Sequence, residues 1–432
     1  MDISIIGSGH VGLVSGACFA DLGNRVVMVD NDSSKITRLK RGQVWFYEPG
    51  LKELVRRSLK ERRLSFTHSI AMAVRQSQVI FICVGTPPLP NGEADLSSVE
   101  HVSREIARSM STYRLVVEKS TVPVQTGEWI KRTLQSSVRK NIPFDVASNP
   151  EFLREGSGIQ DFLHPDRIVL GVETQKAKEL LLALYEPLNA PIIVTDVKSA
   201  ELIKHASNSF LALKISFINA VARICELSGA DVVQVAEGMG MDKRIGRSFL
   251  NAGVGYGGSC FPKDVAAFIR IAEKLGYDFQ LLKAVSQVNT DQRHHLVKRI
   301  ASSLWNLKGK TIGVLGLAFK PDTDDLREAP SIEVIRLLQE AGARVKVFDP
   351  EVMAQMDRSF PGVLGCRDVY EVARGADCLV LLTEWNEFKE LDFKRVKRLM
   401  RQPLVVDGRN LYEPQRLRKL GFHYLGVGRS DS

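Results

Sequence analysis

The sequence predicts an α/β protein with two doubly wound parallel sheets that are joined by a long central helix. Three observations support this prediction. Short apolar strands alternate with helix-length stretches in the first half of the chain, the same rhythm returns after residue 310, and a long helical stretch separates the two halves. A length of 432 residues allows about three domains, and we expect them at residues 1–196, 197–308 and 309–432.

The first half of the chain carries strands that are rich in valine and isoleucine. Such near-continuous apolar strands are typical of a parallel sheet whose two faces are both covered by helices. We expect strands at residues 3–7, 25–30, 79–84, 115–119, 144–148, 166–172 and 191–195. After residue 310, the runs TIGVLGLAF, VKVFDP, ADCLVLLTEW and PLVVDGR predict the strands of the second sheet.

The central block is predicted to be helical. Residues 197–229 have the pattern of one long helix that ends at Gly229, and further helices are expected at 231–237, 263–275 and 281–307. The middle of the long helix, residues 210–221, is apolar on most faces, which predicts that it is buried. The block is therefore interpreted as a helical connector or as the core of a dimer.

Composition and charge exclude several classes of protein. The net charge is +9, but basic and acidic residues are interleaved, which favours a phosphate-bearing small ligand over nucleic acid. The six cysteines form no C-x-x-C pair, so neither a disulfide framework nor a metal site is expected. The first predicted strand leaves no room for a signal peptide, and no apolar run reaches the roughly 18 residues of a spanning helix. We therefore expect a cytoplasmic protein, in a reducing compartment and away from membranes.

The run GSGHVG at residues 7–12 follows an apolar strand and opens a helix. Gly7 permits a tight turn, Gly9 lets the backbone approach a pyrophosphate, and Gly12 allows close packing of helix and strand. Asp30 ends the second predicted strand, where a carboxylate binds the ribose 2′-hydroxyl and repels a 2′-phosphate. Strand, glycines, helix and acid together predict a Rossmann-like site for NAD.

Two threonines also follow predicted strands. Thr86 lies in VGTPP at 84–88 and Thr121 lies in KSTVP at 119–123. The carboxyl ends of parallel strands line the ligand crevice, so both threonines are candidate cofactor or substrate contacts. Their spacing alone is equally compatible with a role in turns or helix caps.

The segment from Gly253 to Asp264 predicts a reactive thiol. Its glycines form a loop whose backbone can approach a ligand closely, and Pro262 suits the first residues of a helix. Cys260 then lies at the helix start beside Lys263, and both the helix dipole and the cation favour its thiolate. A buried, inert cysteine fits a glycine-rich loop poorly. Asp264 either stabilises the helix start or activates a water molecule.

Two further pairs of polar residues stand four positions apart. Lys204 and Asn208 share one face of the long helix, where a lysine can accept a proton or stabilise an alkoxide; solvent exposure is the alternative. Glu151 and Glu155 in NPEFLREG are interpreted as general acid and base, or as an acid pair at a helix start.

The assembled segments resemble the UDP-glucose/GDP-mannose 6-dehydrogenase family from end to end. The matching stretches are GSGHVG, YEPGL, VGTPP, KSTVP, NPEFLREG, FLNAGVGYGGSCFPKD and FKPDTDDLREAPS. FLNAG and DFLHPDRIV are more similar to the UDP-glucose branch than to the GDP-mannose branch. One departure is His10, which stands where the family usually has tyrosine.

The resemblance implies a four-electron oxidation of UDP-glucose to UDP-glucuronate with two NAD⁺ and water. Cys260 would hold the sugar aldehyde as a thiohemiacetal and then as a thioester. The three expected domains would bind NAD, form the helical catalytic and dimerisation core, and bind the UDP-sugar. A homodimer is implied, with Arg244 supplied across its interface.

The resemblance also implies roles for single residues. The implied catalytic residues are Cys260, Lys204, Asn208, Asp264, Glu151 and Thr121. The implied cofactor contacts are Gly7, Gly9, Val11, Gly12, Asp30, Lys35, Thr86, Thr121, Glu155, Lys263 and Arg327. The implied substrate contacts are Glu151, Phe152, Leu153, Arg154, Lys204, Asn208, Arg244, Phe249, Leu250, Asn251, Ala252, Gly253, Tyr256, Gly257 and Lys320.

Three alternatives remain at this point. The same chemistry fits other nucleotide sugars, such as GDP-mannose, UDP-galactose or a UDP-N-acetylhexosamine. A two-electron 3-hydroxyacid-type dehydrogenase also carries a Lys-x-x-x-Asn pair, but it leaves Cys260 and the chain after residue 310 without a role. A nucleotide-sugar or NAD sensor with an inactive site is the third alternative.

Overall fold

The computed structural model describes residues 1–139 and 142–429, which form two compact units. Unit 1 contains residues 1–207 and 266–277, and unit 2 contains residues 208–265 and the chain from 278 onward. Two of the three boundaries, after residues 207 and 265, fall inside helices. The division into three domains that we drew from the sequence stays a prediction.

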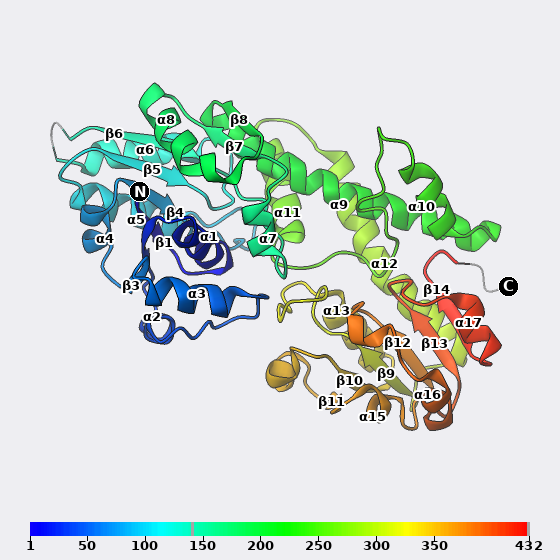
Figure 1. Cartoon of the computed structure of the whole chain (residues 1–432). Helices are drawn as coiled ribbons and strands as arrows, with labels where there is room; N and C mark the ends of the chain where they lie inside the picture. Colours follow the sequence, from blue (N-terminus) through cyan, green and yellow to red (C-terminus); the bar gives the residue numbers. More distant parts are fainter. Residues whose placement is uncertain (140–141, 430–432) are drawn as a thin grey trace. The chain divides into compact units, whose positions relative to one another are not determined.

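Unit 1 is built on an eight-stranded sheet with the order β3-β2-β1-β4-β5-β6-β7-β8 (Figure 1). Its strands are β1 (Asp2–Ile6), β2 (Arg25–Val29), β3 (Leu64–Thr67), β4 (Val79–Ile82), β5 (Arg114–Glu118), β6 (Phe144–Ser148), β7 (Ile168–Gly171) and β8 (Ile192–Thr195). Neighbouring strands are parallel except β6 and β7, which meet antiparallel at Ser148 and Gly171. The first six strands have the doubly wound order that binds dinucleotides.

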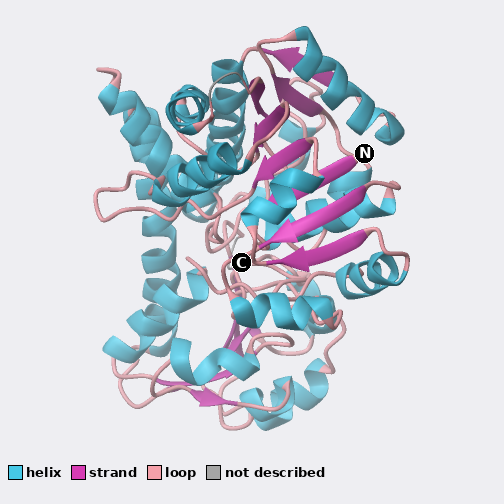
Figure 2. Ribbon diagram, turned by 90° about the vertical axis from the view of Figure 1, so that its left-hand side faces the viewer, coloured by secondary structure: helices cyan, strands magenta, loops and turns pink. Residues whose placement is uncertain are grey.

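Helices cover both faces of this sheet, as Figure 2 shows. Alternate strand residues enter different cores: Val79 and Phe81 pack on one face, whereas Ile80 and Ile82 pack on the other. The helices of this part of the chain are α1 (His10–Asp21), α2 (Ser33–Lys40), α3 (Leu51–Lys60), α4 (Ile70–Gln76), α5 (Ser97–Ser109), α6 (Thr126–Ser137), α7 (Gly158–Leu163), α8 (Gln175–Tyr185) and η1 (Glu186–Leu188).

Unit 2 repeats the same strand order in a six-stranded parallel sheet, β11-β10-β9-β12-β13-β14. Its strands are β9 (Thr311–Leu315), β10 (Arg344–Phe348), β11 (Leu364–Gly365), β12 (Cys378–Leu381), β13 (Leu404–Asp407) and β14 (His423–Gly426). The prediction of two doubly wound parallel-sheet domains is therefore confirmed. Helices after the first sheet are α9 (Val197–Ser228), α10 (Val232–Gly240), α11 (Phe261–Lys274), α12 (Gln280–Leu304), α13 (Pro330–Glu340), η2 (Met353–Gln355), α14 (Met356–Ser359), α15 (Val369–Ala373), η3 (Asn386–Phe388), α16 (Phe393–Leu399) and α17 (Pro414–Lys419).

Helix α9 departs from the prediction in one respect. We expected residues 210–221 to be buried, but Phe210 is 61% exposed and Phe217 is 50% exposed in the single chain, and Ile224 follows at 63%. Residues seven apart lie on one face of a helix, so these side chains form a single apolar stripe. The sequence showed that the segment is apolar on most faces, but not which face the rest of the chain would leave uncovered.

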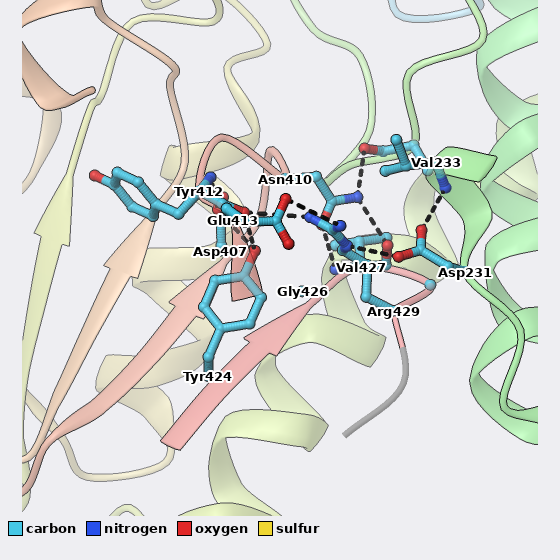
Figure 3. Close-up of polar contacts among 12 residues, drawn as sticks. Asp231, Val233, Asp407, Asn410, Tyr412, Glu413, Tyr424, Gly426, Val427 and Arg429 are labelled. Atoms are coloured by element: carbon cyan, nitrogen blue, oxygen red, sulfur yellow. Dashed lines mark hydrogen bonds and ion pairs between the residues drawn. The ribbon is translucent and has the colours of Figure 1, made fainter. Parts of the chain in front are cut away.

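A polar network anchors strand β14 within unit 2 (Figure 3). Asn410 exchanges two hydrogen bonds with the backbone of Val427, and Arg429 pairs with Asp231 at 3.1 Å. Asp407, which is fully buried at the end of β13, accepts hydrogen bonds from the Tyr412 amide and the Tyr424 hydroxyl. Burial raises the pKa of Asp407 despite these donors.

Among the described residues, no helix combines the length and apolar character needed to cross a membrane.

Two buried carboxyl groups of unit 1 have strongly raised pKa values. Glu118 ends β5, and its Oε1 accepts a hydrogen bond from the Ser120 amide at 2.6 Å. Burial, together with the charge of Glu201, raises the pKa of Glu118 to about 8 despite the hydrogen bonds from Ser120. Burial also raises the pKa of Glu201 to about 7, although Glu201 caps the start of α6 through the amides of Gln125 and Gly127.

Glu118→Gln should change how stability depends on pH. The folded protein keeps a proton on Glu118 that the unfolded chain releases above pH 4.5, so the free energy of unfolding falls as the pH rises from 4.5 to about 8. Glutamine removes this contribution. The free energy of unfolding of the variant, relative to that of the wild type, should therefore increase by at least about 1 kcal/mol between pH 5 and pH 8. Chemical denaturation at both pH values measures this. An equal gain in the exposed control Glu53→Gln would contradict the assignment to a buried carboxyl.

Candidate functional site

The glycine-rich loop between β1 and α1 has the geometry of a pyrophosphate cradle. Gly7 has a φ of +108°, and a Cβ atom on Gly12 would lie 2.0 Å from the Gly7 carbonyl oxygen, so both positions require glycine. A Cβ atom on Gly9 would meet no atom within 4 Å, which leaves open space beside the start of α1. Val11 lies in the first turn of that helix. The loop therefore fits the diphosphate of a dinucleotide.

Asp30 follows β2 and is held in place by the same loop. Its Oδ2 accepts hydrogen bonds from the Ser8 amide at 2.9 Å and the Ser8 hydroxyl at 2.6 Å, and its Oδ1 accepts one from the Asp32 amide. Burial opposes its charge, but these donors and the nearby Lys35 keep the pKa of Asp30 below its ordinary value. A fixed carboxylate at this position suits a ribose diol and disfavours a 2′-phosphate.

Trp45 and Glu48 contact residues of the glycine-rich loop. The Lys35 ammonium lies 4.5 Å from the centre of the Trp45 ring, and the Trp45 indole donates a hydrogen bond to the Ser8 carbonyl at 3.3 Å. His10 pairs with Glu48 at 2.6 Å, and Glu48 also accepts hydrogen bonds from the amides of residues 156 and 158, both at 2.7 Å. Sequence reasoning did not select Ser8, Trp45 or Glu48, although Glu48 stands within the YEPGL match.

The two predicted threonines come together at the ends of β4 and β5. The Thr86 hydroxyl donates a hydrogen bond to the Thr121 carbonyl at 2.8 Å, and Thr86 is buried. The contact joins the loops VGTPP and KSTVP at the carboxyl edge of the sheet, where doubly wound folds bind their ligands.

A buried ion pair links the loop after β6 to helix α9. The Lys204 ammonium donates to Glu151 Oε1 at 3.0 Å, and each side chain is 5% exposed. Glu151 Oε2 accepts the Leu153 amide at 2.6 Å, and the Phe152 ring centre lies 5.4 Å from the ammonium. Residues 149–154 form no helix, so the alternative of an acid pair at a helix start is wrong for Glu151 and Glu155. Glu151 hydrogen-bonds its own loop instead.

Cys260 lies directly before helix α11, as the sequence predicted. The helix begins at Phe261, and the Asp264 amide donates to the Cys260 carbonyl at 2.8 Å, which makes Cys260 the cap residue. Its thiol is partly exposed and lies 3.6 Å from the Ser259 hydroxyl, whereas the other five cysteines are buried. A helix N-terminus favours a thiolate at this position.

Asp264 receives hydrogen bonds from two candidate residues within unit 2. Asn208 donates to its Oδ2 at 2.6 Å and Lys263 donates to its Oδ1 at 2.7 Å, while Asp264 itself is 1% exposed. The two donors fix the orientation of the carboxyl group, which can position a water molecule. The Lys263 ammonium, which we had placed beside the thiol, is thus engaged by its neighbour Asp264.

The glycines of the loop before Cys260 allow its backbone to pack closely against other backbone segments. A Cβ atom on Gly257 would lie 2.2 Å from the Glu328 carbonyl oxygen, and one on Gly253 would lie 2.8 Å from the Gly408 carbonyl oxygen. The Asn219 side chain accepts the Gly253 amide at 2.8 Å, and Asn289 exchanges hydrogen bonds with the backbone of Tyr256. Asn289 was missed because a single asparagine in a helical stretch carries no sequence signal.

Other candidate substrate contacts of unit 2 differ in exposure. Leu250 and Ala252 are buried. Phe249 has a φ of +65°, a strained conformation that is often found at functional sites. Asn251 is exposed and pairs with Arg247.

The charged candidates that remain lie nearer the surface. Arg244 pairs with Asp242, Arg327 pairs with Asp325, and the Lys320 ammonium lies 5.7 Å from the Phe319 ring centre. In unit 1, Arg154 pairs with Asp161 at 2.6 Å and Glu155 is partly buried.

Three family models match successive parts of the chain. Residues 1–189 match the NAD binding domain of the UDP-glucose/GDP-mannose dehydrogenase family, residues 198–291 its central domain, and residues 313–414 its UDP binding domain. The chain belongs to this family. Membership confirms the resemblance that the sequence suggested, and the NAD binding domain contains the glycine-rich loop and Asp30.

Relatives of known name are similar over the full length of the chain. A UDP-glucose 6-dehydrogenase of Bacillus subtilis is 47% identical over 99% of this chain and 93% of its own length. A UDP-glucose 6-dehydrogenase of Rhizobium meliloti is also 47% identical, and both chains are covered completely. The structure of a UDP-glucose dehydrogenase from Pyrobaculum islandicum aligns with a TM-score of 0.93 at 43% identity, over 99% of this chain and 97% of that one.

The hydrogen bonds of Asp30 predict the cofactor preference of this family member. Asp30→Ala should lower kcat/KM for NAD⁺ by about 10- to 100-fold, because a charged acceptor for the ribose is lost. The ratio of kcat/KM for NADP⁺ to that for NAD⁺ should rise. Ser8→Ala is the matched control, since it removes the hydroxyl bond to Asp30 but keeps the carboxylate. An equal change of the ratio in both variants would show that loop geometry, not charge, sets the preference.

Proposed function

We propose that the protein is an NAD-dependent UDP-glucose 6-dehydrogenase that oxidises UDP-glucose to UDP-glucuronate. One UDP-glucose, two NAD⁺ and one water give one UDP-glucuronate, two NADH and three protons. The observation that carries the proposal is the partly exposed Cys260 thiol at the start of α11, in a chain that matches UDP-glucose 6-dehydrogenases from end to end. NAD⁺, when bound at the glycine-rich loop, accepts one hydride in each oxidation.

In the first oxidation, Lys204, as a neutral amine, accepts the proton of the C6 hydroxyl while a hydride leaves the carbon C6. Lys204 is buried beside Glu151, so water competes little for the proton. Asn208 stands four residues along α9 and donates to the oxygen at C6. The product of this step is an aldehyde, which must not escape.

Cys260 retains the aldehyde by adding its sulfur to C6 as a thiohemiacetal. Loss of the second hydride from C6, and of the hydroxyl proton, gives a thioester. Water then attacks C6, the C–S bond breaks, and the thiol is restored. Asp264 positions this water, because its carboxylate is fixed by Asn208 and Lys263. A covalent intermediate lets one site carry out two oxidations.

The remaining assignments complete the proposal. Residues 1–196 bind NAD, 197–308 form the catalytic and dimerisation core, and 309–432 bind the UDP-sugar. The additional cofactor contacts are Lys35, Thr86, Thr121, Glu155, Lys263 and Arg327. The additional substrate contacts are Phe152, Leu153, Arg154, Arg244, residues 249–253, Tyr256, Gly257 and Lys320. Six free thiols fit a cytoplasmic location.

A homodimer explains the apolar stripe of helix α9. Phe210, Phe217 and Ile224 would cover the same stripe on a second copy, as an isologous interface requires. Arg244, whose side chain is 89% exposed, would then reach the substrate of the partner.

Cys260→Ala tests the covalent route. The wild type should produce two NADH for each UDP-glucose consumed, and a panel with GDP-mannose and UDP-N-acetylhexosamines should show UDP-glucose as the preferred substrate. The variant should form UDP-glucuronate at least about 1000-fold more slowly, because the nucleophile is lost. Cys225→Ala, at a buried cysteine, is the control. Acid formation at the wild-type rate in Cys260→Ala, or one NADH per sugar in the wild type, would refute the proposal.

Phe217→Arg tests the dimer. A charge in the apolar stripe should convert the wild-type dimer into monomers, because an unpaired arginine would be buried at the interface. Mass measurement by sedimentation or light scattering distinguishes the two states. Trp305→Arg is the matched control, since Trp305 is 95% exposed and lies outside α9. A monomeric wild type would contradict the assignment.

A further inference from the structure

Glu48 is a buried carboxyl group on the segment between α2 and α3, and its side chain is 1% exposed. Its Oε2 accepts hydrogen bonds from the His10 ring at 2.6 Å and from the Gly156 amide at 2.7 Å. Its Oε1 accepts the Gly158 amide at 2.7 Å. These partners are 38, 108 and 110 residues away along the chain, so one carboxyl group joins three distant segments of unit 1.

His10 belongs to the part of the chain that forms the NAD site. It is the first residue of α1 and directly follows Gly9, where a Cβ atom would meet no atom within 4 Å. No side chain caps this helix start, as a pyrophosphate site at a helix N-terminus requires. The His10 side chain instead bonds Glu48, and its ring centre lies 5.2 Å from that of Phe46. The contact therefore fixes the first turn of α1 from the side.

The two amide donors belong to the loop after β6, which also carries Glu151. The amides of Gly156 and Gly158 stand at the start of α7, where backbone donors have no partner within the helix, and Glu48 supplies the acceptor. The packing around these groups is close. A Cβ atom on Gly158 would lie 3.3 Å from His10 Cε1 and 3.4 Å from Glu48 Oε1.

The residues before Glu48 hold this segment against the glycine-rich loop at a second point. The Trp45 indole donates to the Ser8 carbonyl at 3.3 Å. The rings of Trp45 and Phe46 pack edge to face with their centres 4.9 Å apart, and Phe46 in turn packs on His10. Residues 45–48 thus contact the glycine-rich loop at Ser8 and at the start of α1.

We propose that Glu48 is a positioning residue that fixes the glycine-rich loop against the loop after β6 and thereby strengthens NAD binding. Its carboxyl group is enclosed by its three donors, so it acts on NAD through His10 and the first turn of α1. Loops that are fixed before the ligand arrives lose less conformational freedom on binding. The effect on NAD affinity needs only the NAD binding domain of this family, and its consequence for turnover rests on the proposed function.

A purely structural role for Glu48 makes a different prediction. A carboxyl group that only caps α7 would stabilise the folded chain by its bonds to two amides, and its loss would leave NAD affinity unchanged. The bond to His10 distinguishes the two roles, because it leads to the glycine-rich loop and contributes nothing to the cap of α7.

Binding of NADH to the full-length protein, followed by NADH fluorescence, tests the role without turnover. His10→Phe keeps a ring against Phe46 but removes the donor to Glu48, whereas His10→Gln keeps a donor near the position of Nε2. Tyr113→Phe is the matched control, because it removes a hydrogen bond of 2.7 Å to the Asp145 carboxyl group at the amino end of β5. Thermal unfolding of each variant confirms that it is folded.

The Kd for NADH should rise about tenfold in His10→Phe and in Glu48→Gln, the factor that one hydrogen bond to a charged group supplies. His10→Gln should stay within about threefold of the wild type, because the donor is retained. Tyr113→Phe should bind NADH as the wild type does. An unchanged Kd in His10→Phe, or an equal rise in His10→Gln or Tyr113→Phe, would overturn the proposed role.

The double variant shows whether the two residues act through one contact. His10→Phe combined with Glu48→Gln should bind NADH no more weakly than the weaker single variant, because both changes remove the same bond. A rise in Kd equal to the product of the two single effects would show independent actions and overturn the role. If Glu48→Gln does not fold, the comparison of His10→Phe with His10→Gln still decides.

Turnover separates the role of Glu48 from the proposed function. In His10→Phe, kcat for UDP-glucose oxidation should stay within about twofold, while KM for NAD⁺ rises together with the Kd for NADH. A lower kcat with an unchanged KM for NAD⁺ would overturn the role of Glu48. A wild type that oxidises no UDP-glucose, yet binds NADH about tenfold more tightly than His10→Phe, would overturn the proposed function alone.

Discussion

The ion pair between Glu151 and Lys204 is the interaction on which the proposed chemistry depends. It joins a loop at the carboxyl edge of the first sheet to helix α9, and it is almost fully buried. Neither charge would be tolerated there alone, because the cost of removing an ion from water is several kcal/mol. The Leu153 amide donates a hydrogen bond to the Glu151 carboxylate, and the Phe152 ring centre lies 5.4 Å from the Lys204 ammonium.

Glycine serves two purposes in this chain. In the loop before α1, Gly9 leaves space open, whereas Gly7 and Gly12 allow turn and helix to pack. In the loop before Cys260, the glycines bring the backbone against the segments at Glu328 and Gly408 and do not leave a gap. The second loop is therefore held by its own unit, with Asn219 and Asn289 as additional hydrogen-bond partners. A nucleophile that must meet an aldehyde carbon benefits from such a fixed loop.

The positions of most strands could be anticipated because a parallel sheet buries both of its faces. Apolar runs such as 79–84 and 115–119 are visible in the sequence for that reason, and they agree with β4 and β5 to within two residues at either end. Strand β3 was not anticipated, because Leu64–Thr67 alternates apolar with polar residues over only four positions. The sequence was enough to place Thr86 and Thr121 at one edge of the sheet. It was not enough to predict the hydrogen bond between them, because that bond depends on the conformation of two loops.

The sequence by itself determined the local chemistry: a glycine-rich turn before a helix, an acid after the second strand, and a cysteine at the start of α11. These features depend on residues that are close in the chain, where spacing fixes geometry. Only the tertiary structure decided which charges meet. It paired Glu151 with Lys204 and Glu48 with His10, and it left Phe210 and Phe217 exposed. Contacts between residues far apart in the chain depend on tertiary packing, and the spacing of residues in the sequence does not predict them.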